Sequence, residues 1–249
     1  MKAQIQIHER TFEVDFSKPI DISIPVRASE VSTRAWYVPA AEIKPVVMGS
    51  WIGSVEAGNS VNFRNVFFNP HAHGTHTECV GHISQEFISV DKHLRRFMFH
   101  AALVSIKPMQ VGDDLVITEE QLVTALMPYP SIDAIVIRTL PNTMFKLVIN
   151  YSNTNPAYID AKCIEILNQK GVKHLLIDTP SVDKEKDNGE LLFHKAFWQY
   201  PHNTQLDKTI TEFVFVDSAF PDGAYLLNLQ IGAIDNDAAP SKPILYKLS

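Results

Sequence analysis

The chain has 249 residues, of which 45% are hydrophobic, so it is long enough to bury a substantial core within one domain. A net charge of -6, from 22 basic and 28 acidic side chains, offers no positive surface for a phosphate backbone, and nucleic acid is not expected as a partner. No apolar run has the length of a signal peptide or a membrane span, so we expect a cytoplasmic protein without a membrane partner.

The predicted elements begin with a pair of strands between Gln4 and Phe16, where apolar and polar residues alternate around a polar turn at residues 8–10. Five later segments are short apolar runs rich in β-branched and aromatic residues. We expect them to form core strands, at residues 101–106, 132–137, 172–177, 211–216 and 225–231.

Two helices are predicted between these strands. Residues 118–121 match a capping box, in which Thr118 and Gln121 satisfy each other's unpaired backbone N–H groups, and a helix should begin there. A second helix is predicted from Asn155 to Gly171, because Pro156 suits a first turn, apolar residues recur at helical spacing, and glycine commonly ends a helix.

This mixture of strands with few helices predicts an α/β fold, a single domain over residues 1–249 with a mixed β-sheet and flanking helices. The charged segment 183–189 is short and is expected to be a solvated loop. No segment has the length or composition of a linker between two domains.

Histidines are concentrated in one short segment, because four of the ten lie within residues 71–82. Imidazole and carboxylate groups are ligands that Zn, Mn and Fe prefer, and closely spaced ligands lose less entropy on binding. If residues 74–82 are extended, the strand period of two places His76, Glu78 and His82 on one face. The segment therefore predicts a metal site.

The same segment resembles the signature of the putative cyclase family, a group that includes bacterial kynurenine formamidase. The family pattern is His-x-Gly-Thr-His-x-Asp-x-Pro-x-His. Glu78 keeps a carboxylate at the Asp position, and Val80 replaces the Pro. The positions that match in register are Gly74, Thr75, His76 and His82.

One position departs from the family pattern in a way that affects the metal site. Ala72 stands where the family carries its first histidine. His71 and His73 flank that position, and either could supply the missing ligand from a shifted backbone.

Further segments extend the resemblance over most of the chain. Residues 21–25 resemble the family's opening Asp-Leu-Ser-x-Pro strand, and residues 177–183 resemble its Gly-Ile-Asp-Thr-x-Ser-x-Asp turn. His194 follows at the distance of the family's later histidine. Glu212 matches the carboxylate of its Glu-Asn-Leu strand, although the Asn and Leu are absent.

The resemblance implies a swivelling β/β/α fold and one or two divalent ions, Zn or Mn. It implies that His76 and Glu78 bind a first ion, with His71 or His73 in addition. Glu78 and Glu212 would bridge to a second ion that His194 also binds. Family members are commonly dimers or larger, which implies a homodimer or homotetramer.

The implied activity is hydrolysis of the C–N bond of a small amide, either an arylformamide or a cyclic amide. His82 would be the general acid/base that passes a proton to the leaving nitrogen, and Trp36 would contact the substrate. A lactone or cyclic imide hydrolase of the same family and a metal-binding protein without catalysis are the alternatives.

Some residues in and near these motifs have a competing interpretation. Cys79 could be a nucleophile beside a histidine, but it would face away from the predicted ligands in a strand, so a reduced structural thiol is expected. Asp178 is expected to hold a turn through backbone hydrogen bonds. Trp36, Tyr37 and Trp51 could line a site for a planar substrate or belong to the core.

Overall fold

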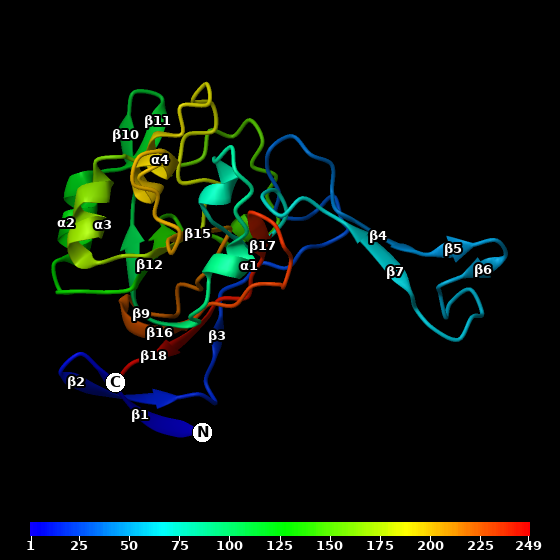
Figure 1. The fold of residues 1–249 in the computed structure, drawn as a ribbon, viewed down its shortest axis with the longest axis horizontal. Coiled ribbons are helices and arrows are strands. Elements are labelled where there is room, and N and C mark those ends of the chain that lie inside the picture. The colour runs from blue at the N-terminus through cyan, green and yellow to red at the C-terminus, as the bar shows by residue number, and fades with distance from the viewer.

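The computed structural model describes residues 1–249, and its largest element is a nine-stranded mixed sheet (Figure 1). The four central strands run parallel to one another, and every further strand is added antiparallel to its neighbour. In sheet order the strands are β17 (Ala238–Pro240), β8 (His76–Glu78), β15 (Thr209–Glu212), β14 (His174–Ile177), β12 (Ala134–Thr139), β9 (Met98–Ile106), β16 (Gly223–Asn228), β18 (Ile244–Lys247) and β3 (Ile20–Asp21).

Helices connect the parallel strands and cover one face of the sheet (Figure 1). They are α2 (Glu119–Leu126), α3 (Cys163–Lys170) and α4 (Leu192–Trp198), each lying between two consecutive parallel strands. Ile135 and Ile137 of β12 belong to a core with these helices, whereas Ala134 and Val136 belong to a separate core on the opposite face. Both faces of β12 are thus buried, as expected for a central parallel strand.

Short elements complete the body of the molecule. The helical turns are η1 (Val80–His82), α1 (Val90–His93) and η2 (Met144–Leu147). The hairpin of β1 (Lys2–Ile7) and β2 (Arg10–Asp15) lies beside β18, and a small sheet contains β10 (Met109–Val111), β11 (Asp114–Ile117) and β13 (Tyr158–Ile159). None of the helices combines the length and apolar character that crossing a membrane requires.

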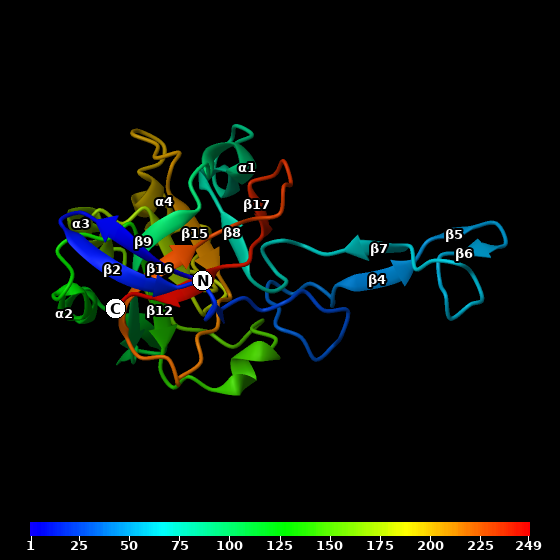
Figure 2. The same ribbon diagram turned by 90° about the horizontal axis from the view of Figure 1, so that it is seen from below.

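A two-stranded arm extends away from this body, as Figures 1 and 2 show from two directions. β4 (Glu42–Pro45) pairs with β7 (Arg64–Phe67), and β5 (Val47–Met48) pairs with β6 (Trp51–Ile52) nearer the tip. All residues of β4 and β7 are exposed. The sequence did not predict this arm.

The predicted fold class, an α/β domain with a mixed sheet, is confirmed. The N-terminal strand pair and the five core strands are present, with shifted ends. The capping box is also present: the Thr118 hydroxyl accepts a hydrogen bond from the Gln121 N–H (3.4 Å), and the Thr118 N–H donates to Gln121 Oε1 (3.2 Å).

Three predicted boundaries are wrong. The second helix begins at Cys163 rather than at Asn155, because residues 158–159 pair with β11 instead. The strand expected over residues 211–216 ends at Glu212, since the next residue has a left-handed backbone with φ of 55°. The extended segment expected over 74–82 is limited to β8, after which the chain turns into η1.

Candidate metal centre

The glycine and threonine of the histidine motif fix the backbone from which its ligands project. Gly74 has φ of 67°, and a Cβ there would lie 2.6 Å from the carbonyl oxygen of Ile24, so both the conformation and the close approach require glycine. The hydroxyl of Thr75 accepts a hydrogen bond from the Ile24 N–H (2.7 Å) and donates to the carbonyl of Phe213. β8 therefore enters the sheet in a defined position.

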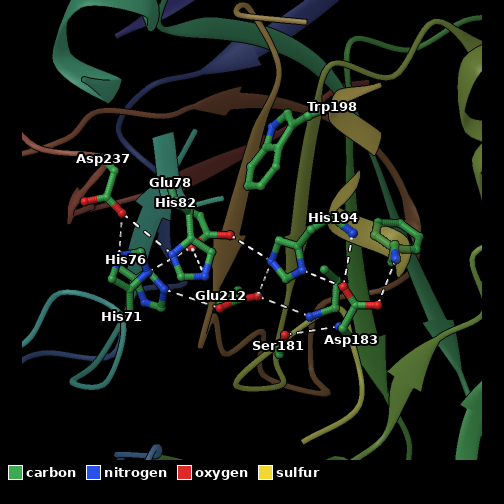
Figure 3. A network of polar contacts seen from close by, with 12 residues as sticks. His71, His76, Glu78, His82, Ser181, Asp183, His194, Trp198, Glu212 and Asp237 are labelled. Carbon is green, nitrogen blue, oxygen red and sulfur yellow. Dashed lines mark hydrogen bonds and ion pairs between the residues drawn. The ribbon is translucent and has the colours of Figure 1, made fainter. Parts of the chain in front are cut away.

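The centre of the site is formed by two buried carboxylates surrounded by imidazole rings (Figure 3). His71 Nδ1 lies 2.9 Å from Glu78 Oε2, and His194 Nε2 lies 3.1 Å from Glu78 Oε1. His76 Nε2 lies 3.3 Å from Glu212 Oε2. Five of the residues predicted as metal ligands are thus brought together.

His82 lies at the edge of this group, although it reaches that place from a 3-10 turn rather than from the predicted strand. Its Nε2 is 3.9 Å from Glu78 Oε2, and its ring stacks on that of His71 with 4.2 Å between the centroids. About a third of its side chain is exposed, whereas Glu78 beside it is buried.

Asp237 is a member of the cluster that sequence reasoning missed. Its Oδ2 accepts a hydrogen bond from His71 Nε2 (2.7 Å) and lies 3.7 Å from His82 Nδ1. These imidazoles hold the pKa of Asp237 well below its ordinary value. Asp237 immediately precedes β17, which pairs with β8, so strand pairing brings the carboxylate to the site.

Asp183, expected in a solvated loop, is instead buried and oriented toward His194. Its Oδ2 lies 2.6 Å from His194 Nδ1, and its two oxygens accept the backbone N–H groups of Phe193 and His194 at the start of α4. Burial opposes ionisation of Asp183, but the hydrogen bonds from His194 outweigh it and lower the pKa. The turn at residues 177–183 was the one sequence signal that pointed to this aspartate.

The protonation of each group in the cluster depends on the charges of its neighbours. Burial and the neighbouring charge of Glu78 raise the pKa of Glu212. Burial would lower the pKa of His71, but hydrogen bonds to Asp237 and Glu78 raise it to about 10. The pKa of His194 is likewise raised to about 10 by Asp183 and Glu78, against the effect of burial. The carboxylates of the cluster thus favour a positive charge on the groups beside them.

The donors fit a divalent cation. His76 Nε2 is buried and makes no well-aligned hydrogen bond, although Glu212 Oε2 lies 3.3 Å away, and a ring nitrogen buried in this way is costly unless it has a further ligand. The combination of imidazole nitrogens and carboxylate oxygens is typical of Zn and Mn sites. Ligand atoms lie within 4.8 Å of one another in each of three sets, which are His71 with His76 and Glu78, His71 with His82 and Asp237, and Glu78 with His82 and His194.

His71, rather than His73, lies in the position left open by Ala72. His73 Nδ1 contacts the backbone N–H and carbonyl of Asn69 at 3.0 and 3.1 Å, and its Nε2 lies 2.9 Å from the carbonyl of Pro39. Because both ring nitrogens face backbone groups, the structure does not bring His73 into the cluster.

An open cavity of about 410 Å³ lies above the cluster and is reached by Trp36, His71, His82, His194 and Glu212. The indole N–H of Trp36 donates to the carbonyl of His71 (3.2 Å), and the backbone of Trp36 is in the left-handed region, with φ of 65°. Such strain is common at functional sites. Trp51, in contrast, lies on the arm beside Phe63.

Cys79 and Asp178 have structural positions. Cys79 is buried, its Sγ lies 3.4 Å from the carbonyl oxygen of Ile88, and burial raises the pKa of its thiol to about 11, an environment typical of a structural thiol. Asp178 accepts hydrogen bonds from the Thr139 N–H (2.9 Å) and hydroxyl (2.8 Å) and pairs with Lys146 (2.7 Å), so its side chain links the end of β14 to the end of β12 instead of bonding to the backbone of its own turn.

Comparison with known proteins agrees with the fold. A family model described as a putative cyclase matches residues 14–184. A predicted metal-dependent hydrolase from Bacillus stearothermophilus has 16% sequence identity and a TM-score of 0.63, covering 92% of this chain and 98% of its own.

Two further solved structures are similar over nearly the whole chain. One, described as a novel cyclase, has 13% identity and a TM-score of 0.68, covering 94% of this chain and 90% of its own. The other is isatin hydrolase A from Labrenzia aggregata, bound to benzyl benzoate, with 13% identity, a TM-score of 0.64, and coverage of 92% and 93%. At these identities the structures establish a shared fold.

Proposed function

The chain belongs to the putative cyclase family, and on that premise we propose that it is a metal-dependent hydrolase of the C–N bond in a small aromatic amide, either an arylformamide or a cyclic amide. The observation that carries the proposal is the buried Nε2 of His76, which makes no well-aligned hydrogen bond although the Glu212 carboxylate lies 3.3 Å away. A cation bound by both groups would satisfy the ring nitrogen and the carboxylate together.

The residues that would hold the metal are those nearest the two buried carboxylates. His71, His76 and Glu78 form one set, and His194 with Glu212 lies on the other side of Glu78. A bound divalent cation would lower the pKa of a water molecule towards neutrality and polarise the scissile carbonyl.

His82 is assigned the proton transfer. Water adds its oxygen to the carbonyl carbon, the C–N bond breaks, and the leaving nitrogen takes a proton from His82, which the proton given up by water restores. Stacking on His71 and the nearby carboxylate of Asp237 hold the ring of His82 at the cavity. Without this proton the nitrogen would leave as an unstable anion.

Trp36 is the proposed contact for the aromatic part of the substrate, because it lines the cavity and is fixed by its hydrogen bond to His71. The similarity to proteins described as isatin hydrolases makes a cyclic aromatic amide the first substrate to assay. An arylformamide, an aryl lactone and a cyclic imide complete the panel, since the last two represent the alternative activities.

Metal content is the first test. We expect the wild-type protein, purified without chelator, to carry zinc or manganese by elemental analysis, and His76→Ala to lose most of it. His202→Ala is the matched control, because it removes an exposed imidazole that is not part of the cluster and should retain the wild-type metal content. Equal metal in all three proteins would contradict the assignment of His76.

Turnover is the second test. We expect the metal-loaded protein to hydrolyse one amide of the panel. His82→Ala should retain the metal and hydrolyse that amide at least ~100-fold more slowly. Metal without turnover of any panel compound would favour the alternative of a metal-binding protein without catalysis.

A further inference from the structure

A second cavity, of about 220 Å³, lies at the end of the parallel strands opposite to the metal centre. Asp133 immediately precedes β12, and His174 is the first residue of β14, whereas Glu212 of the metal cluster is the last residue of β15. No residue lines both this cavity and the one above the cluster. The lining of the second cavity includes Arg95, Arg96, Phe99, Asp133, Lys173 and His174.

Hydrogen bonds between neighbouring strands fix the floor of this cavity. The carbonyl oxygen of Asp133 accepts the N–H groups of Lys173 (2.9 Å) and His174 (3.1 Å). One carboxylate oxygen of Asp133 accepts the N–H of His100 in β9 (2.9 Å). The ring centroid of Phe99, also in β9, lies 4.0 Å from that of His174. Because β9, β12 and β14 are adjacent in the sheet, the floor is formed before a ligand binds.

His174 contributes a ring nitrogen that is free to bind a ligand. The residue is 5% exposed, its Nδ1 lies 2.8 Å from the hydroxyl of Thr209, and its Nε2 makes no hydrogen bond within the chain. Burial lowers the pKa of His174 to about 4, so the ring is neutral at pH 7. A hydroxyl can donate as well as accept, and when Thr209 donates to Nδ1 the ring proton is on Nε2. Nε2–H is then a hydrogen-bond donor for a ligand.

Two cations at the rim of the cavity have no counter-charge in the chain. Lys173 pairs with Asp207, but neither Arg95 nor Arg96 forms an ion pair with any carboxylate. The guanidinium carbon of Arg96 lies 6.0 Å from the centroid of the Phe99 ring, next to the floor. The nearest acceptor of Arg95 is a backbone carbonyl oxygen at 3.5 Å. Both guanidinium groups are therefore available to an anion.

We propose that this cavity binds a small dianionic oxyanion, either inorganic phosphate or the phosphate group of a small ester. Arg95 and Arg96 each donate parallel N–H groups to its oxygens, and the Nε2–H of His174 holds it against the floor. A phosphate ester carries a charge of about −1.5 to −2 at pH 7, which matches two unpaired guanidinium groups better than a single carboxylate does. The site is independent of the proposed hydrolase activity.

The size and the charges of the cavity restrict the ligand further. Sites for drug-sized molecules have volumes of roughly 300–1,000 Å³, so the smaller volume here suits a phosphate group rather than a bulky ligand. Asp133 and Asp207 also line the cavity and oppose a weakly held anion, which makes the two arginines the decisive contacts. A nucleic-acid backbone would require an extended basic surface, and the chain has a net charge of -6.

Calorimetric titration with sodium phosphate at pH 7.5 and constant ionic strength is the first test. We expect wild type to bind one phosphate with a Kd below about 1 mM, and the double variant Arg95→Gln, Arg96→Gln to bind at least ~10-fold more weakly. The double variant Arg10→Gln, Arg27→Gln is the matched control, because it removes the same charge from exposed arginines that also lack ion pairs. It should bind phosphate as wild type does.

A second variant separates this cavity from the metal centre, where a bound cation could also attract phosphate. His76→Ala, which is designed to lose the metal, should keep the wild-type Kd for phosphate within about twofold. Phosphate should also raise the midpoint of thermal unfolding of wild type and His76→Ala, but not of the Arg95, Arg96 variant. Phosphate binding that is lost in His76→Ala and retained in the arginine variant would overturn the proposal.

The source of the phosphate group is tested by comparing inorganic phosphate with glycerol phosphate, sodium acetate and a single-stranded DNA oligonucleotide. Tighter binding of the inorganic ion would support a site for free phosphate, and tighter binding of glycerol phosphate would support a site for an ester. Acetate that competes as well as phosphate, or an oligonucleotide that binds through the arginines when neither phosphate does, would refute a dianion site. The absence of saturable phosphate binding up to about 10 mM would refute it as well.

Discussion

The hydrogen bond between Asp183 and His194 provides a quantitative test of how the metal site is organised. Asp183 Oδ2 lies 2.6 Å from His194 Nδ1, which directs the opposite ring nitrogen, Nε2, toward Glu78. A carboxylate in this position fixes the ring orientation and makes the imidazole a better ligand. Asp183→Asn preserves the shape of the side chain and removes its charge.

The expected magnitude follows from the three hydrogen bonds that Asp183 accepts. An asparagine oxygen can replace Oδ2 toward the ring and the N–H of His194, but its NH₂ group would then face the N–H of Phe193. The variant loses the charge of two of these hydrogen bonds and the whole of the third. Because hydrogen bonds to charged groups contribute about 1.5–3 kcal/mol, metal affinity should fall about 10–100-fold.

The assay is competition between the protein and a chromophoric chelator for zinc at pH 7.5, with Asp187→Asn as the matched control. Asp187 lies in the same loop and accepts the N–H groups of Gly189 and Leu191, but makes no hydrogen bond to His194. Far-UV circular dichroism separates loss of metal from loss of fold. Zinc affinities that agree within about twofold for wild type and Asp183→Asn would refute the reasoning.

Three other perturbations test the framework around the site. Lys146→Met removes the cation that pairs with the buried carboxylate of Asp178, and it should lower the free energy of unfolding by about 3–5 kcal/mol in urea titrations. The double variant that also carries Asp178→Leu should recover part of this loss. Gly74→Ala places a Cβ on a left-handed backbone and against a carbonyl oxygen, so it should lower the free energy of unfolding by at least ~2 kcal/mol and reduce the metal content. Gly112→Ala is the control, because Gly112 has a similar φ but open space around it. It should lower the free energy of unfolding by about 1 kcal/mol and retain the metal. Burial lowers the pKa of His174 from its ordinary value of 6.5 to about 4, so the unfolded chain binds more protons than the folded chain between these two values. The free energy of unfolding should therefore fall as pH drops through that window, by on the order of 3 kcal/mol. In urea titrations at pH 7, 5.5 and 4, the free energy of unfolding should fall less for His174→Gln than for wild type. Equal decreases in the two proteins would contradict the assignment of this pH dependence to His174.

Local sequence signals predicted the elements whose formation depends on local interactions. The capping box at Thr118 needs only the residues of its own first turn, and α2 begins there as predicted. The second helix was predicted too early because its first residues were read at helical spacing. Residues 158–159 form strand pairs with residues 116–117, some 40 positions earlier, and this distant partner has no signature in the segment itself.

The same distinction separates the site residues that could be predicted from those that could not. His76 and Glu78 belong to one short motif, and the family pattern added His194 and Glu212. Asp237 has no comparable signal, because it reaches His71 only through the pairing of β17 with β8, across 166 positions of sequence. Its immediate neighbours in the sequence resemble an ordinary polar loop.

The register between β8 and β15 is the structural condition on which the site depends. β8 runs antiparallel to β15, so His76 at its start lies opposite Glu212 at the end of β15, near the loops that follow the parallel strands. A shift of one residue would turn His76 and Glu78 to the opposite face of the sheet. On that face the hydroxyls of Thr77 and Thr211 are hydrogen-bonded at 2.7 Å, deep in the interior. Because a shifted register would leave these hydroxyls buried without partners, the bond that aligns the two strands also keeps the ligands on the metal side.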